Sequence, residues 1–351
     1  MGRRDTGTDD PRVRVRPGRG SRPRTKVRPD WSGRPLGRVV AIDRGRWGVV
    51  LDGDTTRVQA VRAKELGRGA IVMGDRVRLT GDLSGRPDTL ARIVAVEERS
   101  TVLRRSLEDA PDQLGEKVIV ANAEVMVIVV ALADPPPRQG MVDRCLVAAY
   151  EAGLRPVLCL TKADLADPAA FLATYADFDL DTVVTSPAHE GLDRLRELLG
   201  GRFSVLVGHS GVGKSTLINE LVPGAGRAVG HVNDVTGRGR HTSTSSEAFE
   251  LPGGGWVVDT PGVRSFGLGH VGVDDVLAVF PDVAGAATWC LPMCTHAADE
   301  PSCALDAWAR GGAPFDPVPL EEGARRSSRV ASVRRLLGAV ATAAAASRAA
   351  R

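Results

Sequence analysis

The sequence lacks a long, uninterrupted run of apolar residues. The longest apolar stretch lies around residues 118–133 and is broken by Asn122 and Glu124, whereas a membrane-spanning helix needs about 20 consecutive apolar residues. The N-terminus also lacks the apolar segment of a signal peptide. We therefore expect a cytoplasmic protein that does not enter a membrane.

Acidic residues are absent from the C-terminal end and few at the N-terminal end. From Gly323 onward seven arginines face no acid, and residues 1–35 carry eleven basic and only four acidic residues, so each end has a charge of +7. The net charge of +3 then leaves −11 for the body between them. Two basic arms suit a polyanionic partner. The alternative is that they are solvated tails that only aid solubility.

Large apolar side chains are nearly absent from residues 1–35. Aromatic side chains are nearly absent from residues 36–100, where Trp47 is the only one. The first segment is rich in Gly, Pro and Arg and is predicted to be disordered. With so few stacking residues, the second would contact RNA mainly through phosphates. It is predicted to be an OB-type β-barrel, because turn residues separate five short β-branched runs at 38–42, 47–51, 57–61, 76–79 and 92–96.

From residue 101 onward, apolar strands alternate with helical stretches. This alternation predicts a doubly wound α/β sheet. Strands are expected at 124–133, 154–160, 181–184, 203–207 and 255–258, with helices at 140–152, 191–199 and 216–222.

A phosphate-binding loop follows the strand at 203–207. Its residues, GHSGVGKST, fit the pattern GxxxxGK[ST] and precede a helix, which is the required context. Backbone N–H groups around the glycines can bind phosphates, the lysine bridges the β- and γ-phosphates, and the serine hydroxyl ligates Mg²⁺. The loop comprises Gly208, His209, Ser210, Gly211, Val212, Gly213, Lys214, Ser215 and Thr216.

A second motif, at the end of an apolar strand, indicates that the base is guanine. It consists of Thr161, Lys162, Ala163 and Asp164. The carboxylate of Asp164 can accept hydrogen bonds from the N1–H and exocyclic NH₂ groups of guanine, a pair of donors that adenine lacks. The stem of Lys162 would cover the purine face. Thr161 stands where asparagine is commoner, and backbone contacts can come from residues 185–186 at the next strand's end.

The third nucleotide motif, DTPG, follows the last of the strands. Asp259 can hold the Mg²⁺ shell through water, and the Gly262 amide can reach the γ-phosphate. A hydroxyl-rich segment lies between the phosphate loop and this motif. One of Thr242, Ser243 and Thr244 should complete the Mg²⁺ coordination.

The order of these motifs is permuted. A conventional GTPase runs from the phosphate loop through the switch threonine and DxxG to the base-reading motif, whereas here Asp164 comes first and DTPG last. The same sheet can form with relocated termini, because permutation leaves packing intact. The sequence therefore predicts a circularly permuted P-loop GTPase.

The cysteines are few, five in all, and three of them lie with a histidine within fourteen residues: Cys290, Cys294, His296 and Cys303. In a cytoplasmic protein such a cluster favours Zn²⁺ over disulfides, and three thiolates with one imidazole fill a closed tetrahedral site. The alternative is a set of unliganded thiols. Cys145 and Cys159, in apolar periodic stretches, are expected to be core residues.

Together these elements resemble the ribosome small-subunit-dependent GTPase A family (RsgA, also called YjeQ). The resemblance covers residues 36–307 and rests on GHSGVGKSTLIN at 208–219, GRGRHTST at 237–244, DTPGVRSFGL at 259–268 and the cysteine cluster. It implies a late role in maturation of the small ribosomal subunit and its rRNA, with GTP hydrolysis stimulated by the subunit and coupled to release. Thr161 departs from the family's pattern, and so do the zinc spacings, shorter by one residue in the first interval and longer by one in the last.

The motifs do not identify the residue that orients the attacking water during hydrolysis. The position after DxxG, where Ras-like enzymes have a glutamine, is Val263, which can neither donate nor accept a hydrogen bond. His241, beside the switch hydroxyls, is the candidate replacement, and the resemblance points to the same histidine. The alternative is an exposed loop histidine without a role.

The expected protein is a monomeric GTPase that uses GTP/GDP, Mg²⁺ and one structural Zn²⁺. Two other functions are open: a P-loop kinase or ATPase acting on a small molecule, against which Asp164 argues, and an RNA-binding scaffold with a vestigial nucleotide site. We divide the chain into a disordered basic arm (1–35), a barrel (36–100), a permuted GTPase domain (101–270) and a zinc-binding module with a basic helical tail (271–351).

Overall fold

The computed structural model describes residues 30–67, 69–106, 116–178, 180–186, 190–226, 246–259, 268 and 271–349. Its large compact unit begins at Arg34, and most of the predicted basic arm, residues 1–35, lies outside the described residues. Within the described ranges, no helix combines the length and apolar character needed to cross a membrane.

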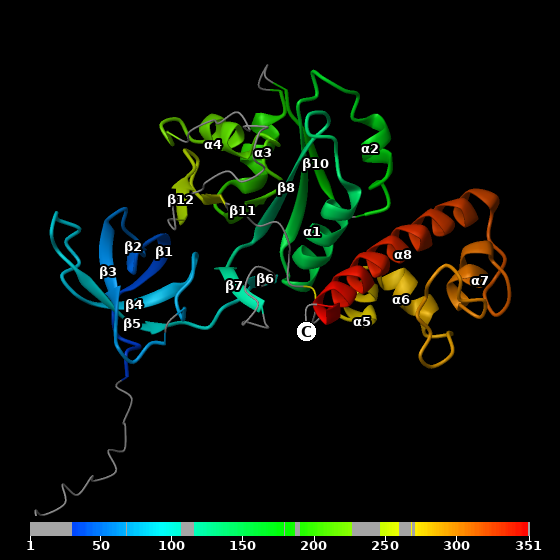
Figure 1. Cartoon of the computed structure of the whole chain (residues 1–351), viewed down its shortest axis with the longest axis horizontal. Helices are drawn as coiled ribbons and strands as arrows, with labels where there is room; N and C mark the ends of the chain where they lie inside the picture. Colours follow the sequence, from blue (N-terminus) through cyan, green and yellow to red (C-terminus); the bar gives the residue numbers. More distant parts are fainter. Residues whose placement is uncertain are drawn as a thin grey trace, which may run out of the picture. The chain divides into compact units, whose positions relative to one another are not determined.

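The first five strands are β1 (Leu36–Asp43), β2 (Arg46–Leu51), β3 (Arg57–Arg62), β4 (Arg76–Gly81) and β5 (Ala91–Val96). They pair in the order β1-β2-β3-β5-β4, and β4 pairs with β1 to close the barrel (Figure 1, blue to cyan). Alternate side chains point inward, among them Val39, Val58 and Val77, as the period of two requires. The predicted OB-type barrel is confirmed.

A two-stranded hairpin of β6 (Val102–Ser106) and β7 (Glu116–Ala121) follows the barrel. The sequence did not predict it, because residues 118–121 continue into a longer apolar run. Asn122 separates β7 from the next strand: its φ of +55° lies in the left-handed region, which asparagine tolerates. Its buried side chain accepts a hydrogen bond from the Ser100 amide (2.9 Å) and donates one to the Gly74 carbonyl (3.1 Å).

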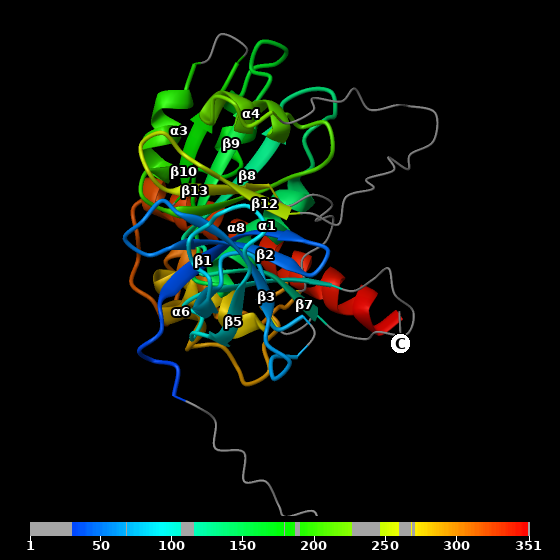
Figure 2. The same ribbon diagram turned by 90° about the vertical axis from the view of Figure 1, so that its left-hand side faces the viewer.

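The central sheet contains five parallel strands and one antiparallel strand. These are β8 (Val125–Ala131), β9 (Arg155–Thr161), β10 (Asp181–Val184), β11 (Phe203–Val207), β12 (Ser246–Glu250) and β13 (Trp256–Asp259). They run in the order β10-β9-β8-β11-β13-β12, with β12 antiparallel to β13. Figure 2 labels β8, β9, β10, β12 and β13 of this sheet. The five predicted strands are confirmed. Strand β12 was not predicted, because only Ala248 in it is buried.

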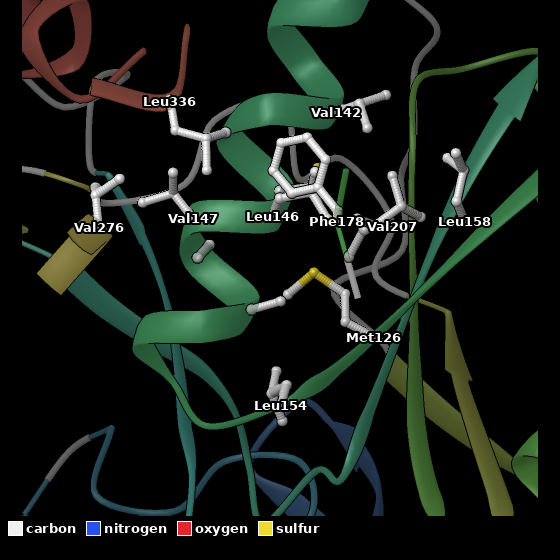
Figure 3. Packing of buried hydrophobic residues seen from close by; sticks show 14 of the residues in the cluster. Met126, Val142, Leu146, Val147, Leu154, Leu158, Phe178, Val207, Val276 and Leu336 are labelled. Atoms are coloured by element: carbon white, nitrogen blue, oxygen red, sulfur yellow. The ribbon is translucent and has the colours of Figure 1, made fainter. Parts of the chain in front are cut away.

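Helices cover both faces of this sheet. They are α1 (Gln139–Glu151), α2 (Ala169–Ala173), α3 (Leu192–Leu199) and α4 (Lys214–Leu221). Met126 and Ile128 of β8 belong to the core that contains α1, where Met126 lies near Leu146 (Figure 3). Val127, between them in β8, belongs to a second core with the apolar side chains of α3 and α4. This alternation confirms the doubly wound α/β fold.

The C-terminal module is helical, as predicted. It contains α5 (Val273–Ala278), α6 (Pro281–Ala287), α7 (Ala304–Arg310) and the long α8 (Leu320–Ala349). Helix α8 packs against α1 and α7. Leu336 of α8 and Val276 of α5 lie beside Val147 of α1 (Figure 3), so the module shares its core with one face of the GTPase sheet.

Helix α8 is not a free basic arm. Three of the acids that bind its arginines lie outside the helix, so the acid-free sequence after residue 322 did not reveal them. Five arginines of this helix pair with four acids, so most of their positive charge is neutralised within the fold, although Arg325 remains exposed. At 2.7–3.1 Å, Arg325 and Arg326 pair with Glu322, Arg329 with Asp282, Arg334 with Asp306, and Arg335 with Asp143.

Candidate nucleotide and metal sites

The three nucleotide motifs meet at one edge of the sheet. Strand β9 ends at Thr161 and β11 at Val207, with β8 between them. Strand β13 ends at Asp259, which lies opposite Leu206 of β11. Because parallel strands present their carboxyl ends at the same edge, motifs that are far apart in the sequence converge there.

The phosphate loop has a backbone that only its glycines permit. Gly208 and Gly213 have φ angles of +153° and +93°. A side chain at Gly208 would also lie 2.4 Å from the Val129 carbonyl oxygen. The loop therefore passes close to β8 and turns directly into α4, the geometry that leaves backbone N–H groups available to an anion.

Lys214 places its charge inside this loop. Its Nζ donates to the Gly208 and His209 carbonyl oxygens, at 2.7 Å each. Burial lowers the pKa of Lys214, and the nearby carboxylate of Asp259 opposes that shift. A partly dehydrated ammonium group gains from an anionic partner, which is the role the motif assigns to it.

The base-reading motif is tied to the phosphate loop by a hydrogen bond. The Thr161 hydroxyl is buried and donates to the Val212 carbonyl oxygen (2.7 Å). Lys162 adopts a φ of +59° and donates from Nζ to the Asp134 carbonyl oxygen. Asp164 lies exposed two residues further on.

A cavity of about 230 Å³ lies between these segments. The sequence predicted most of its wall, but not Leu217 and Glu220, which lie one turn into α4. Leu217 lies four residues after Gly213 and Glu220 four residues after Thr216, which was the available signal. The cavity is lined by Thr161, Lys162, Thr185, Ser186, Gly213, Thr216, Leu217 and Glu220.

Hard oxygen donors suitable for Mg²⁺ flank the phosphate loop. Ser215 follows Lys214 at the start of α4, and Asp259 lies at the end of β13 with only 6% of its surface exposed. Asp259 lies opposite Leu206, two residues before the phosphate loop begins at Gly208, which places it beside the loop. The other predicted residues of this site, His241, Thr242 and Gly262, lie outside the described residues.

The predicted metal ligands come together in the C-terminal module. The three sulfur atoms of Cys290, Cys294 and Cys303 lie 3.5, 3.5 and 3.7 Å from Nδ1 of His296. In a tetrahedral zinc site with bonds of about 2.0–2.3 Å, sulfur and nitrogen ligands lie ~3.6 Å apart. The four residues therefore could hold a zinc ion, and the one-residue changes in spacing do not prevent this.

Neighbouring groups support this cluster. The Ala304 amide donates to Cys290 Sγ (3.3 Å). Arg334 of α8 donates to the His296 carbonyl oxygen (3.0 Å) and to both carboxylate oxygens of Asp306 (2.9 Å each). Such outer contacts orient metal ligands. Cys145 and Cys159 are fully buried, as expected, and burial raises the pKa of each thiol to about 12.

Known proteins are similar in sequence to most of this chain. The sequence profile of the RsgA GTPase family matches residues 96–269. A Pseudomonas putida protein named small ribosomal subunit biogenesis GTPase RsgA is 39% identical over 283 residues, covering 78% of this chain and 76% of that protein. A Pseudomonas fluorescens protein of the same name is 42% identical over 245 residues, covering 67% and 68%.

Two solved structures share the fold. The crystal structure of YjeQ from Thermotoga maritima is 25% identical, covers 87% of this chain and 99% of its own, and superposes with a TM-score of 0.59. The crystal structure of YloQ, a circularly permuted GTPase, is 22% identical, covers 86% and 95%, and has a TM-score of 0.57. The permuted order of the motifs thus has a structural counterpart.

Proposed function

The chain belongs to the RsgA GTPase family and is a GTPase, and from this premise we propose that it acts on the small ribosomal subunit during late maturation and leaves it when GTP is hydrolysed. The relatives' names support the choice of partner. The structural observation that supports the chemistry is the convergence of the base-reading motif, the phosphate loop and Asp259 at one sheet edge, where Thr161, Lys162, Gly213 and Thr216 line a cavity.

In this proposal the nucleotide lies along that edge. Its guanine is read by Asp164, with the stem of Lys162 against the purine face, and Thr161 and Ala163 hold the turn. Residues 208–216 bind the phosphates. Ser215, Asp259 through water and one of Thr242, Ser243 and Thr244 would hold Mg²⁺, and the Gly262 amide would respond to the γ-phosphate.

Hydrolysis requires charge neutralisation and an oriented water molecule. Lys214 and the loop amides neutralise charge on the phosphates, and Mg²⁺, when bound, adds to this. Val263 cannot orient water, so the free protein is expected to hydrolyse GTP slowly. In the proposal, His241 orients the attacking water only after the protein has bound the subunit. The catalytic site is then complete only on the correct partner.

The remaining parts are assigned to docking. A single structural zinc ion on Cys290, Cys294, His296 and Cys303 holds the C-terminal module (271–351), and the barrel (36–100) and the basic arm (1–35) contact rRNA phosphates. The GTPase domain spans 101–270. We assign the protein to the cytoplasm as a monomer.

The deciding experiment is GTP turnover measured with and without purified small subunits, with large subunits as the control. We expect slow turnover alone, acceleration by small subunits and none by large ones. Competition against labelled GDP should show displacement by GTP but not by ATP. No acceleration would reject the ribosomal role, and displacement by ATP would favour another P-loop enzyme.

A further inference from the structure

The barrel is joined to the two strands of the GTPase sheet that flank β13. The N-terminal part of β1 closes the barrel against β4, but its later residues Ala41 and Ile42 pair with Glu247 and Ser246 of β12. Strand β12 in turn pairs with β13 through Ala248 and Val258. The path from the barrel to the end of β13 is therefore a continuous hydrogen-bonded sheet.

An ion pair reinforces the first junction. Arg57 of β3 contacts the Glu247 carboxylate at 3.0 Å, with both side chains nearly half exposed. The guanidinium passes over Gly48, where an added side chain would lie 3.0 Å from Arg57 Nε. Because Gly48 has no side chain, the Arg57 side chain can extend over it from β3 to Glu247 on β12.

A second junction lies at the start of β11, the strand that leads into the phosphate loop. The guanidinium of Arg38 in β1 stacks over the Phe203 ring, 4.8 Å from its centroid, and donates to the Asn122 carbonyl oxygen (3.3 Å). Gly74 lies so close that a side chain there would be 2.1 Å from the Ala121 carbonyl oxygen and 2.8 Å from the Phe203 ring. The barrel and the base of β11 are in direct contact.

Strand β12 depends on the barrel for its position. It has five residues, of which Ala248 alone is buried, while Phe249 packs partly buried against the core of α3 and α4. Among the described residues of the GTPase sheet, β12 pairs only with β13. A short strand paired on one side and nearly without buried side chains is weakly fixed in register, and a slip of one residue would turn Ala248 away from the core. Pairing with β1 fixes that register.

We propose that Arg57 and Glu247 are positioning residues for hydrolysis, because they hold β12 against the barrel and so position the strand that ends at Asp259. A partner that shifts the barrel would then shift Asp259 through β12 and the phosphate loop through β11. These contacts form a contiguous physical connection between the barrel and the reacting phosphate. This inference rests on the proposed function of the nucleotide site and of the barrel.

Charge reversal tests the proposal. Arg57→Glu and Glu247→Arg each place like charges across the junction, and the double variant Arg57→Glu/Glu247→Arg restores the pair. Arg92→Glu is the matched control: Arg92 is an exposed arginine on β5, so this variant changes the barrel charge equally without facing β12. Subunit-stimulated kcat, GTP affinity and subunit affinity are measured for all four variants and the parent.

Each single reversal should lower stimulated kcat about two- to fivefold relative to Arg92→Glu, the range expected for an exposed pair, with GTP affinity unchanged. The double variant should return to the level of the Arg92→Glu control. Equal effects of Arg57→Glu and Arg92→Glu, or no recovery in the double variant, would overturn the inference. A parent protein that subunits do not stimulate would instead contradict the proposed function.

Discussion

At the scale of single residues, Thr161 shows how the chain accommodates a departure from the common base-reading motif. Its hydroxyl has one hydrogen to donate, and the Val212 carbonyl oxygen receives it at 2.7 Å; the Val130 carbonyl oxygen lies further away, at 3.3 Å. The residue is 6% exposed. Thr161 therefore fastens the end of β9 to the phosphate loop, and the two sides of the nucleotide cavity keep a fixed spacing.

Replacing Thr161 by valine keeps the shape and removes this hydrogen bond. A buried carbonyl deprived of its donor costs about 1–3 kcal/mol, so GTP affinity should fall about tenfold, measured by isothermal titration. Thr161→Ser retains the hydroxyl and should bind almost as the parent does. Unchanged affinity in Thr161→Val would show that the loop keeps its position without this contact.

His241 is the second residue with a specific expectation. If it orients water only on the docked protein, His241→Ala should keep GTP affinity and subunit binding but lose most of the subunit-stimulated rate, because each positioned proton acceptor contributes about 10²–10⁴-fold. Single-turnover hydrolysis on saturating subunits is the measurement. A variant stimulated as strongly as the parent would transfer the catalytic role to a ribosomal group.

At the scale of elements, α8 attaches the C-terminal module to the GTPase sheet through buried charge. Arg335 Nε lies 3.1 Å from both carboxylate oxygens of Asp143 on α1, and the guanidinium also donates to the Thr174 carbonyl oxygen (3.2 Å). Its plane covers the Tyr175 ring, 5.1 Å from the centroid. The Asp143 side chain is 3% exposed. Burial raises the pKa of Asp143, and Arg335 opposes this shift more strongly than Tyr175 and Arg144 do.

Arg335→Met should destabilise the protein by about 3–5 kcal/mol, because it leaves a buried carboxylate unpaired. Urea unfolding followed by circular dichroism measures the change. The double variant Arg335→Met/Asp143→Leu removes both charges and should recover most of the loss. Arg325→Met, at an exposed pair, is the control and should change stability by less than about 0.5 kcal/mol. Equal effects of the two single variants would contradict the assignment.

The cluster of Cys290, Cys294, His296 and Cys303, which could hold a zinc ion, is the second feature at the scale of elements. Cys294→Ser should lower the zinc content from one ion per chain and unfold the loop between α6 and α7, because a closed four-ligand site provides folding energy to a small module. Subunit binding should weaken while GTP binding persists, since the nucleotide motifs lie on the sheet. Metal analysis by mass spectrometry checks the stoichiometry, and native protein without zinc would remove the basis for this role.

At the scale of the whole molecule, the basic residues at the two ends of the chain have different roles. The C-terminal arginines that pair with Asp143, Asp282, Asp306 and Glu322 stabilise the fold. Residues 1–35 carry +7 in a segment too polar to form a core. Electrostatic affinity for RNA is therefore expected mainly from the N-terminal arm and the barrel.

Deleting residues 1–35 should weaken subunit binding and flatten its dependence on salt, because each phosphate contact adds about 0.7–0.9 to the slope of log K against log salt. GTP affinity should not change. A full-length variant with the eleven basic residues of this arm replaced by glutamine separates charge from chain length and should behave as the deletion does. An unchanged salt slope in either variant would reject an electrostatic role.

Much of the fold follows from local patterns. Five short, alternating β-branched runs separated by turn residues predicted the barrel, and the alternation of apolar strands and helices predicted the doubly wound sheet. Patterns failed where local burial was slight or ambiguous. Strand β12, with Ala248 alone buried, has no apolar alternation, and β7 merges with β8 into one apolar run in the sequence.

The sequence by itself determined the permuted order of the motifs and was enough to predict the chemistry of the sites. Phosphate loops, base-reading turns and zinc ligands need fixed residue types at short spacings, so Lys214, Asp164 and Cys294 are recognisable in one dimension. Only the tertiary structure decided which distant groups meet: Arg335 with Asp143, 192 residues away, and the barrel with β12. Such contacts depend on how completed elements pack, and packing of this kind has no local sequence pattern.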